Sequence, residues 1–400
     1  MNCEIFPMIP FSRRLLLILT AISLTMVAVG VTARPAFAQR LVRVWYTLSD
    51  EALIGAWIGA YETAREGRVK IEARPVQLHQ MEALLLSETT LPDALIAPSD
   101  LAGRLIHARL LTQLDIKIVP DFRAQIIPSA WETVSYDART VGIPLLMEGT
   151  LLFYNRALVT GDLPTTDDAL FAAAKTYEAG GKIGLALTLG VYPTAGIYNA
   201  FGGIIINDSG VNQLSVGTAF RDYLSYLRAL RGAAGIALNG GREGFKAGNT
   251  AFALDSSWTL GNYAAALGDR LGVLALPTVK GAIWRPFVRT QALYVRLGAV
   301  QGDAALDFAR FITEQDAQSL AAKAGAIPVN PVVGKDDPLL AAIHAQFEQG
   351  ISLPNRYEMS AYWAPLADAV SDAYFGDDPL PAILARTIRA VDDRLLHLPR

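Results

Sequence analysis

Two carboxylates are candidates for binding chemistry because both lie where burial is predicted. Asp100 directly follows the apolar stretch 92–98, and Glu148 lies inside the long apolar stretch 140–158. An unpaired carboxylate is costly to bury, so we expect Glu148 either to bind a ligand or to form an ion pair. Asp100 has a structural alternative, since Asp is a preferred N-cap and a helix is predicted to begin directly after it.

Aromatic rings at the ends of predicted elements are the second group with binding chemistry. Trp258 follows a predicted strand, and the adjacent Tyr362 and Trp363 lie where a helix is predicted to begin, between Ser360 and Pro365. That start is set by Pro365, which a helix tolerates in its first turn. An indole or phenol ring covers the apolar C–H face of a sugar, and a carboxylate accepts hydrogen bonds from its hydroxyls. The helical spacing around this pair is equally typical of core packing, so both interpretations stand.

Strand and helix patterns alternate in the segments that must position these residues. The alternating runs, beginning with a strand, are 41–48, 51–65, 68–76, 81–89, 92–98 and 101–111. This alternation predicts an α/β fold with helices on both faces of a sheet. The apolar stretch 140–158 contains Pro144 and Gly149, which favours two strands with a crossing between them over a helix.

The N-terminal segment has the three parts of a secretory signal peptide. Arg13 and Arg14 precede an apolar run, and Ala36-Phe37-Ala38 is a small-x-small cleavage site, so we expect residues 1–38 to be removed. The only cysteine, Cys3, lies in this segment, which excludes disulfides, cysteine-bound metal and a lipid anchor at the cleavage point from the mature chain. We therefore expect a soluble periplasmic or otherwise extracytoplasmic protein.

Charge and length exclude several classes of protein. The whole chain carries −3, and the first 38 residues carry three Arg against one Glu, a net +2, so the mature chain carries about −5. No basic stripe points to a nucleic acid partner. About 360 mature residues are too many for one core and suit two domains, and no linker separates them. The domains are therefore predicted to share the chain through several crossings.

Four segments together resemble one family, the extracytoplasmic solute-binding proteins of ABC importers, in the branch of the maltose/maltodextrin-binding proteins. In order they read "PDALIAPSDLAGRLIHARLLTQLD", "VGIPLLMEGTLLFYNRALV", "FKAGNTAFALDSSW" followed by "LGVLALPTVKGAIWRPFV", and "PNRYEMSAYW". The resemblance implies a type II periplasmic-binding-protein fold with two α/β lobes, three hinge crossings and a ligand cleft between the lobes. It places residues 39–146 with 290–332 in an N-terminal lobe, and 147–289 with 333–400 in a C-terminal lobe.

The resemblance also implies a function and a ligand site. The function is capture of a carbohydrate, similar to maltose or maltodextrin, by hinge closure, followed by delivery to the transmembrane subunits of an ABC permease. It implies no catalysis and no cofactor or metal, and we expect a monomer. The residues that match the family's ligand-binding positions are Asp100, Glu148, Tyr192, Trp258 and Trp363, with Tyr362 as a further candidate.

Three positions depart from the maltose-binding pattern and put the identity of the sugar in doubt. Ala97 replaces a tryptophan, Leu101 replaces an arginine, and Gly190 replaces a glutamate. Loss of the aromatic wall at Ala97 suggests a longer or bulkier saccharide. Arg285 and Arg289 flank the return crossing, and either could replace the lost arginine or bind an acidic sugar. The alternatives are that they are solvated or pair with carboxylates.

Two alternative functions compete with sugar import. A secreted glycosidase would need two opposed carboxylates, and Asp100 with Glu148 is formally such a pair. No nucleophile elbow, P-loop or H-E-x-x-H motif accompanies them, and the four histidines have no metal-ligand spacing. The other alternative keeps the fold but binds iron, a polyamine or a phosphorylated compound.

Overall fold

The computed structural model describes residues 39–178, 182–238 and 241–398. The predicted signal peptide, residues 1–38, lies outside the described residues. The first segment alternates strand and helix as predicted, through β1 (Arg40–Tyr46), α2 (Glu51–Ala64), β2 (Val69–Pro75), η1 (Leu78–Gln80), α3 (Met81–Ser87), β3 (Ala94–Pro98), η2 (Ser99–Leu101) and α4 (Ala102–His107). The helix predicted over 101–111 ends earlier, at His107, and Arg109 has a positive φ of 58° that no helix accommodates.

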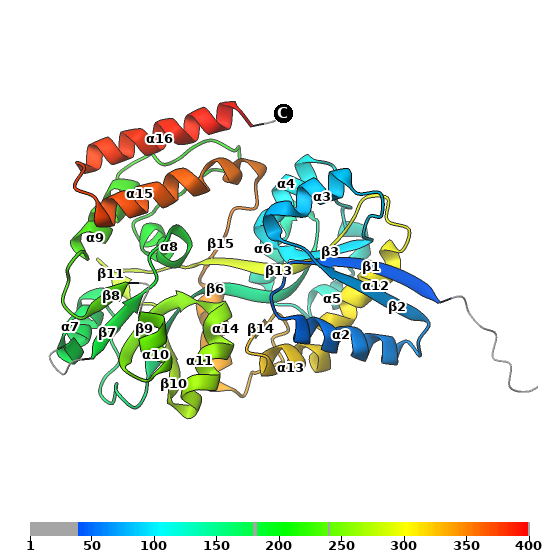
Figure 1. Cartoon of the computed structure of the whole chain (residues 1–400), viewed down its shortest axis with the longest axis horizontal. Helices are drawn as coiled ribbons and strands as arrows, with labels where there is room; N and C mark the ends of the chain where they lie inside the picture. Colours follow the sequence, from blue (N-terminus) through cyan, green and yellow to red (C-terminus); the bar gives the residue numbers. More distant parts are fainter. Residues whose placement is uncertain (1–38, 179–181, 239–240, 399–400) are drawn as a thin grey trace, which may run out of the picture. The chain divides into compact units, whose positions relative to one another are not determined.

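Two long strands, β6 (Ile143–Asn155) and β13 (Phe287–Val295), run antiparallel beside each other through the middle of the structure (Figure 1). The main sheet has the strand order β2-β1-β3-β13-β6-β9-β7-β8, which includes β7 (Ile183–Leu187), β8 (Ile236–Leu238) and β9 (Thr250–Ser256). Short strands extend it: β10 (Leu271–Leu274) and β14 (Ile327–Pro328) pair with β6, and β15 (Ile351–Ser352) pairs with β13.

The stretch predicted as two strands is a single strand, β6, which is 13 residues long. The register between β6 and β13 shifts at Gln291/Ala292, next to the position where Pro144 lies opposite Ala292. Proline has no N–H to donate to the ladder, and a bulge at this point accommodates it. At Gly149 the strand passes so close to the ring of Phe347 that a Cβ would lie 2.5 Å from it. The breakers in the sequence therefore mark a bulge and a close approach, and the strand continues through both.

Smaller elements complete the two ends of the sheet. Between β3 and β6 lie η3 (Asp115–Lys117), α5 (Pro120–Arg123), α6 (Pro128–Thr133) and the hairpin β4 (Ser135–Tyr136) and β5 (Arg139–Thr140). After β6 come α7 (Asp167–Glu178), α8 (Val191–Ala200), α9 (Ala219–Ala229), α10 (Gly241–Lys246), η4 (Ser257–Thr259), α11 (Leu260–Leu267), η5 (Gly268–Arg270), β11 (Thr278–Val279) and β12 (Ala282–Ile283). After β13 come α12 (Gly302–Thr313), α13 (Gln315–Lys323), α14 (Pro338–Glu348), η6 (Tyr357–Ala361), α15 (Trp363–Phe375) and α16 (Leu380–Leu396).

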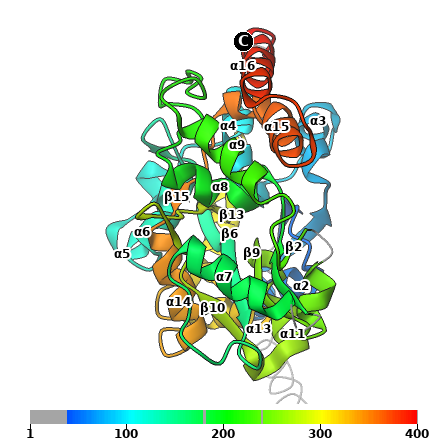
Figure 2. The same cartoon turned by 90° about the vertical axis from the view of Figure 1, so that its left-hand side faces the viewer.

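Two hydrophobic cores lie along the sheet. The first is built mainly on β1–β3, β6, β13 and the helices α2, α12 and α13, and it includes Trp45. The second is built on β7, β9 and the helices α8, α9, α15 and α16, the last two of which pack side by side (Figure 2). Because β6 and β13 contribute to both cores, they are the natural place to look for a site formed by both.

No helix among the described residues has the length and apolar character needed to cross a bilayer.

Candidate functional site

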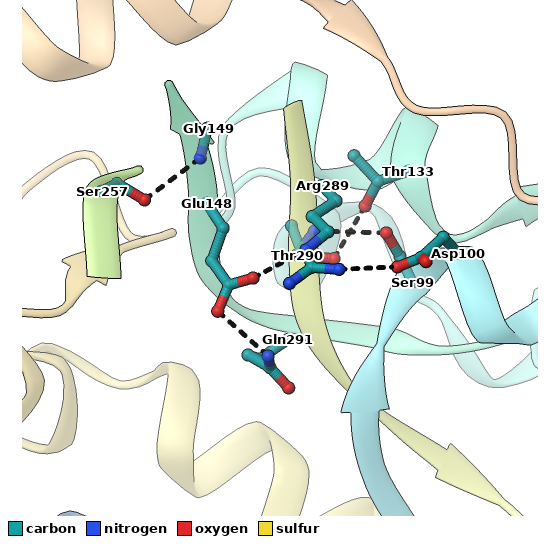
Figure 3. A network of polar contacts seen from close by, with 9 residues as sticks. All are labelled: Ser99, Asp100, Thr133, Glu148, Gly149, Ser257, Arg289, Thr290 and Gln291. Carbon is teal, nitrogen blue, oxygen red and sulfur yellow. Dashed lines mark hydrogen bonds and ion pairs between the residues drawn. The ribbon is translucent and has the colours of Figure 1, made fainter. Parts of the chain in front are cut away.

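Three neighbouring strands bring together charged residues that lie far apart in the sequence. In the antiparallel ladder of β13 and β6, Arg289 is the direct partner of Glu148, so their side chains leave the sheet on the same face. Asp100 lies in η2, which begins where β3 ends, and β3 pairs with the other edge of β13. Arg289 on the middle strand can therefore reach a carboxylate on each side (Figure 3).

The Arg289 guanidinium forms ion pairs with both predicted carboxylates. Its Nε donates to Glu148 Oε2 at 2.8 Å, and its Nη1 donates to Asp100 Oδ1 at 3.1 Å. Glu148 is only 9% exposed and the Arg289 side chain 18%. Burial alone would lower the pKa of Arg289, but the two carboxylates outweigh it and raise that pKa above its usual value. Arg289 therefore keeps its positive charge beside the two carboxylates.

These contacts decide between the alternatives that the sequence left open for the charged residues. Asp100 makes no capping hydrogen bond to η2 or α4, so the N-cap interpretation is wrong. Glu148 does form the expected ion pair, and of the two arginines near the return crossing it is Arg289 that supplies it. Arg285 instead donates to the backbone carbonyls of residues 349 and 350.

Two aromatic side chains, from α8 and from η4, lie over the same guanidinium. Tyr192, in the first turn of α8, and Trp258, in η4, have their ring centroids 5.8 Å apart at an angle of 23°. The Arg289 Cζ lies 5.4 Å from the Tyr192 ring and 5.5 Å from the Trp258 ring, within cation–π range of both. Trp258 remains 50% exposed, which is unusual for so large an apolar side chain.

Hydrogen bonds from the strands around the charged cluster fix its geometry. Gln291, two residues after Arg289 and on the same face of β13, donates its Nε2 to Glu148 Oε1 at 3.0 Å. The Gly149 N–H donates to Ser257 Oγ at 3.1 Å, which ties β6 to the turn that carries Trp258. Further bonds join Thr290 to Ser99 and Thr133. The sequence interpretation overlooked Gln291, although two polar residues at i and i+2 in an apolar strand are the signal that could have revealed it.

A buried network holds the turn on which Trp258 lies. Asp255, at the end of β9, accepts hydrogen bonds from Arg242 Nε and Nη2, both at 2.7 Å, and from the Tyr263 hydroxyl at 2.7 Å. Asp255 is 1% exposed. Its ion-pair partner Arg242 lies 13 residues away in the sequence, on α10.

A cleft of about 710 Å³ opens beside Glu148 and Trp258. Its walls come from the loop after β1, the middle of β6, the η4–α11 segment and the end of α13. The charged or aromatic residues that line it are Asp50, Glu51, Glu148, Trp258 and Lys323. A volume of this size suits a small-molecule ligand of several rings.

The remaining two predicted aromatics have different surroundings. The helix α15 begins at Trp363, inside the predicted window 360–365. Tyr362 is fully buried in the second core, with 0% exposure, so in this conformation it packs and offers no face to a ligand. Trp363 is partly buried against the same core, and no contact joins it to the Arg289 cluster among the described residues.

Two of the three departures from the maltose-binding pattern are core positions. Ala97 is fully buried in β3 and Leu101 is 5% exposed, and both belong to the first core. The idea that Ala97 leaves a wall of the site open for a larger saccharide is therefore wrong, since Ala97→Trp would overpack the core. Gly190 precedes the first turn of α8 with an extended backbone, two residues before Tyr192.

No group of three or more potential metal-ligating residues is present in the part of the chain that the structure describes. The site is therefore built from carboxylates, one guanidinium, one amide and two aromatic faces.

Comparison with known proteins identifies a family over most of the chain. Residues 56–348 match the family model described as bacterial extracellular solute-binding protein. A maltotriose-binding protein of Pyrococcus abyssi is 24% identical over 76% of this chain and 70% of its own length. A galactooligosaccharide-binding protein of Bacillus subtilis is 24% identical over 91% of this chain and 92% of its own.

The fold agrees with a solved structure of the same kind. A maltotriose binding protein of Thermus thermophilus, bound with maltotriose, superposes with a TM-score of 0.75 at 23% identity. The match covers 88% of this chain and 99% of that protein. The predicted α/β fold, with the two lobes of the type II binding proteins, is thereby confirmed.

Proposed function

The chain belongs to the bacterial extracellular solute-binding proteins, and we propose that its solute is a neutral oligosaccharide of the maltodextrin type. As the sequence led us to expect, the family is one of binding proteins and not of enzymes. The glycosidase alternative therefore falls away. Asp100 and Glu148 both form ion pairs with Arg289, an arrangement that can hydrogen-bond to the hydroxyl groups of a ligand.

One observation carries the proposal: carboxylates from the two strands beside β13, and aromatic rings from α8 and η4, converge on the Arg289 guanidinium. Two members of this cluster, Glu148 and Trp258, line the cleft of about 710 Å³. A sugar ring needs an apolar surface for its C–H face and polar atoms for its rim. In this proposal Trp258 and Tyr192 provide the apolar surface, while Asp100 and Glu148 accept hydrogen bonds from the hydroxyl groups of the sugar. Trp363, at the start of α15, contributes a further ring face once the cleft has closed.

Transport follows from the same proposal. We assign residues 39–146 with 290–332 to one lobe, and 147–289 with 333–400 to the other. Ligand closes the lobes about the hinge because its affinity for the closed form is greater. The closed form then docks on the transmembrane subunits of an ABC permease. In this view the mature chain is exported, loses residues 1–38 and acts as a soluble monomer without a lipid anchor.

The proposal is tested by a thermal-shift screen of the chain from residue 39 onward. Maltotriose, longer maltodextrins, cyclodextrins, trehalose and galactooligosaccharides form the saccharide panel, with spermidine, ferric citrate and glycerol phosphate as non-sugar solutes. A ligand that binds only the folded state raises the melting temperature as its concentration increases. We expect a concentration-dependent rise with one saccharide series.

If only a non-sugar solute raises the melting temperature, the fold assignment stands and the proposed sugar ligand is rejected. The screen is then followed by calorimetry on the strongest ligand and by small-angle scattering with and without it. Closure about the hinge predicts a smaller radius of gyration when ligand is bound, and an unchanged radius would reject the hinge motion.

A further inference from the structure

We propose that Gly261 and Gly325 are positioning residues, whose contact without side chains sets how closely two walls of the ligand cleft approach each other. The inference rests on the proposed function and adds to it a determinant of affinity that acts through the width of the cleft. Both glycines line the cleft of about 710 Å³ that Glu148 and Trp258 also line. Gly261 lies in α11, three residues after Trp258, and Gly325 lies two residues after the end of α13.

The two glycines bring main chain directly against main chain. A Cβ added to Gly325 would overlap Gly261 Cα and lie 2.7 Å from the Gly261 nitrogen. A Cβ added to Gly261 would lie 2.9 Å from the Ala324 carbonyl oxygen. Neither position therefore accepts a side chain while the contact is kept. Because glycine is unfavourable within a helix, the contact, and not helix formation, accounts for glycine at position 261.

Separate anchors hold the two sides of this contact. On one side, Tyr263 of α11 donates its hydroxyl to Asp255 at 2.7 Å, and its ring meets that of Phe153 of β6 edge to face at a centroid distance of 5.0 Å. On the other side, Trp57 of α2 donates its Nε1 to the Ala317 carbonyl of α13 at 2.9 Å. In the assignment proposed above, α11 and α13 belong to different lobes. The glycine contact therefore joins the two lobes at the edge of the cleft.

A side chain at this contact would act on the ligand by moving the lobes. Lobes joined by a hinge relieve the overlap by moving apart, which the ligand-free protein can do without disturbing either core. With a sugar bound, the same movement separates the wall that carries Trp258 from the wall formed by the end of α13. A ligand favours the closed form only through its contacts in that form, so a wider cleft lowers its affinity. A side chain at either glycine should therefore weaken binding and leave the fold intact.

Two pairs of variants test the contact from both sides. Gly261→Ala adds one methyl group to α11, and its control is Gly55→Ala in α2, where an added Cβ meets no atom within 4 Å. Gly325 has a φ of 80°, which asparagine tolerates, so the second variant is Gly325→Asn. Its control is Gly232→Asn, at a φ of 70° and with open space around the added Cβ.

Affinity, dissociation rate and stability are measured on the same samples, with the saccharide that raises the melting temperature most in the thermal-shift screen. In calorimetry we expect Gly261→Ala and Gly325→Asn to bind it roughly tenfold more weakly than wild type, and both controls to match wild type within about twofold. Stopped-flow tryptophan fluorescence should assign the loss to faster dissociation, because the overlap acts on the closed complex. The melting temperature of ligand-free Gly261→Ala should equal or slightly exceed that of wild type. Small-angle scattering should give the ligand-bound variants a larger radius of gyration than ligand-bound wild type.

The outcomes distinguish this inference from the function on which it rests. Wild-type affinity in Gly261→Ala overturns the role of the contact while sugar binding stands, and a lower melting temperature in the same variant would make the contact ordinary packing. Weaker binding with the radius of gyration of ligand-bound wild type would mean that the methyl group meets the sugar directly, which also overturns the inference. No binding of any saccharide by wild type overturns the proposed function itself. If circular dichroism shows that Gly325→Asn does not fold, Gly261→Ala decides the test.

Discussion

Asp255 and Asp100 each form an ion pair with an arginine, but the two networks differ in how completely their atoms are used. Asp255 accepts two bonds from Arg242, one from the Tyr263 hydroxyl and one from the Ser256 N–H, so both of its oxygens are fully occupied. At the Arg289 cluster, Arg289 uses Nε and Nη1, and neither Asp100 Oδ2 nor Arg289 Nη2 has a hydrogen-bond partner among the described residues.

The difference in hydrogen bonding indicates that these two ion-pair networks have different roles. A fully satisfied network within a low-dielectric surrounding rigidifies the backbone that carries it. That backbone is the end of β9, three residues before Trp258, whose exposed ring is a proposed ligand face. A cluster with accessible donors and acceptors can bind something else. In our proposal the Asp255 network, called the closed network below, positions a residue that contacts the ligand, and the Arg289 cluster is part of the ligand site.

The largest effect on stability is expected from a substitution that removes Arg242 from the closed network. Arg242→Met leaves the Asp255 carboxylate buried with only the Tyr263 hydroxyl and its local N–H group as partners. The Asp255 side chain is 2% exposed but that of Arg242 is 44% exposed, so the cost should lie between the roughly 1 kcal/mol of an exposed ion pair and the roughly 3 kcal/mol of a fully buried one. We expect the free energy of unfolding, measured by urea denaturation, to fall by an amount within this range.

The control for this variant is Arg221→Met, which breaks the exposed pair with Asp222. Exposed ion pairs contribute between roughly 0 and 1 kcal/mol, so its unfolding curve should nearly match that of wild type. Equal stability of the two variants would contradict the structural role of the closed network.

The next largest effect is expected at Trp258, whose ring the closed network positions. Trp258→Ala removes a half-exposed face and both of its ring contacts, with Tyr192 and with Arg289. We expect ligand affinity to fall at least tenfold, roughly 1.4 kcal/mol, with little change in melting temperature. Calorimetry and a thermal melt of the same sample measure the two quantities. A large loss of melting temperature with unchanged affinity would make Trp258 a packing residue.

The charged site was partly predictable because the sequence marks buried polar positions clearly. Glu148 lies in an apolar strand, and an ion pair or a ligand were the alternatives that desolvation allows. The choice of Arg289 over Arg285 depends on register: in the ladder of β13 and β6, Arg289 lies opposite Glu148. Arg285 lies before β13 begins at Phe287 and has no place in that ladder. A single sequence does not contain the strand boundary or the register, and a shift by one residue would turn Arg289 to the other face.

The fold was predictable where hydrophobic periodicity is strong and less so where breakers occur. The alternation over the first segment gave β1 to α4 with boundaries near those observed. Pro144 and Gly149 were interpreted as interruptions, whereas a register shift absorbs the proline and the glycine admits Phe347. The interpretation of Ala97 as a missing wall of the site was also wrong, because a match to a relative's binding position says nothing about how the local core is packed.

A smaller effect is expected from the neighbours Tyr362 and Trp363, which have the same chemistry but different burial. Trp363→Ala should weaken ligand binding by about tenfold and leave the melting temperature nearly unchanged, if its ring reaches the ligand on closure. Tyr362→Phe should not alter affinity, because the ring is fully buried. Its hydroxyl has no hydrogen-bond partner among the described residues, so its loss should be neutral or slightly stabilising. Loss of affinity in Tyr362→Phe would show that the hydroxyl group reaches the ligand.

The smallest expected effect is an absence of pH dependence in ligand affinity between pH 7 and pH 9.5. Burial raises the pKa of the Tyr192 phenol above its usual value, and Glu148 and Asp100 raise it further against the opposing effect of Arg289. The carboxylates likewise raise the pKa of Arg289. Both groups therefore keep their protons throughout this range, and binding neither takes up nor releases protons. Calorimetry in buffers of different ionisation enthalpy measures this directly. A fall in affinity above pH 8.5 would mean that the phenol ionises, and hence that water reaches Tyr192 in the ligand-free cleft.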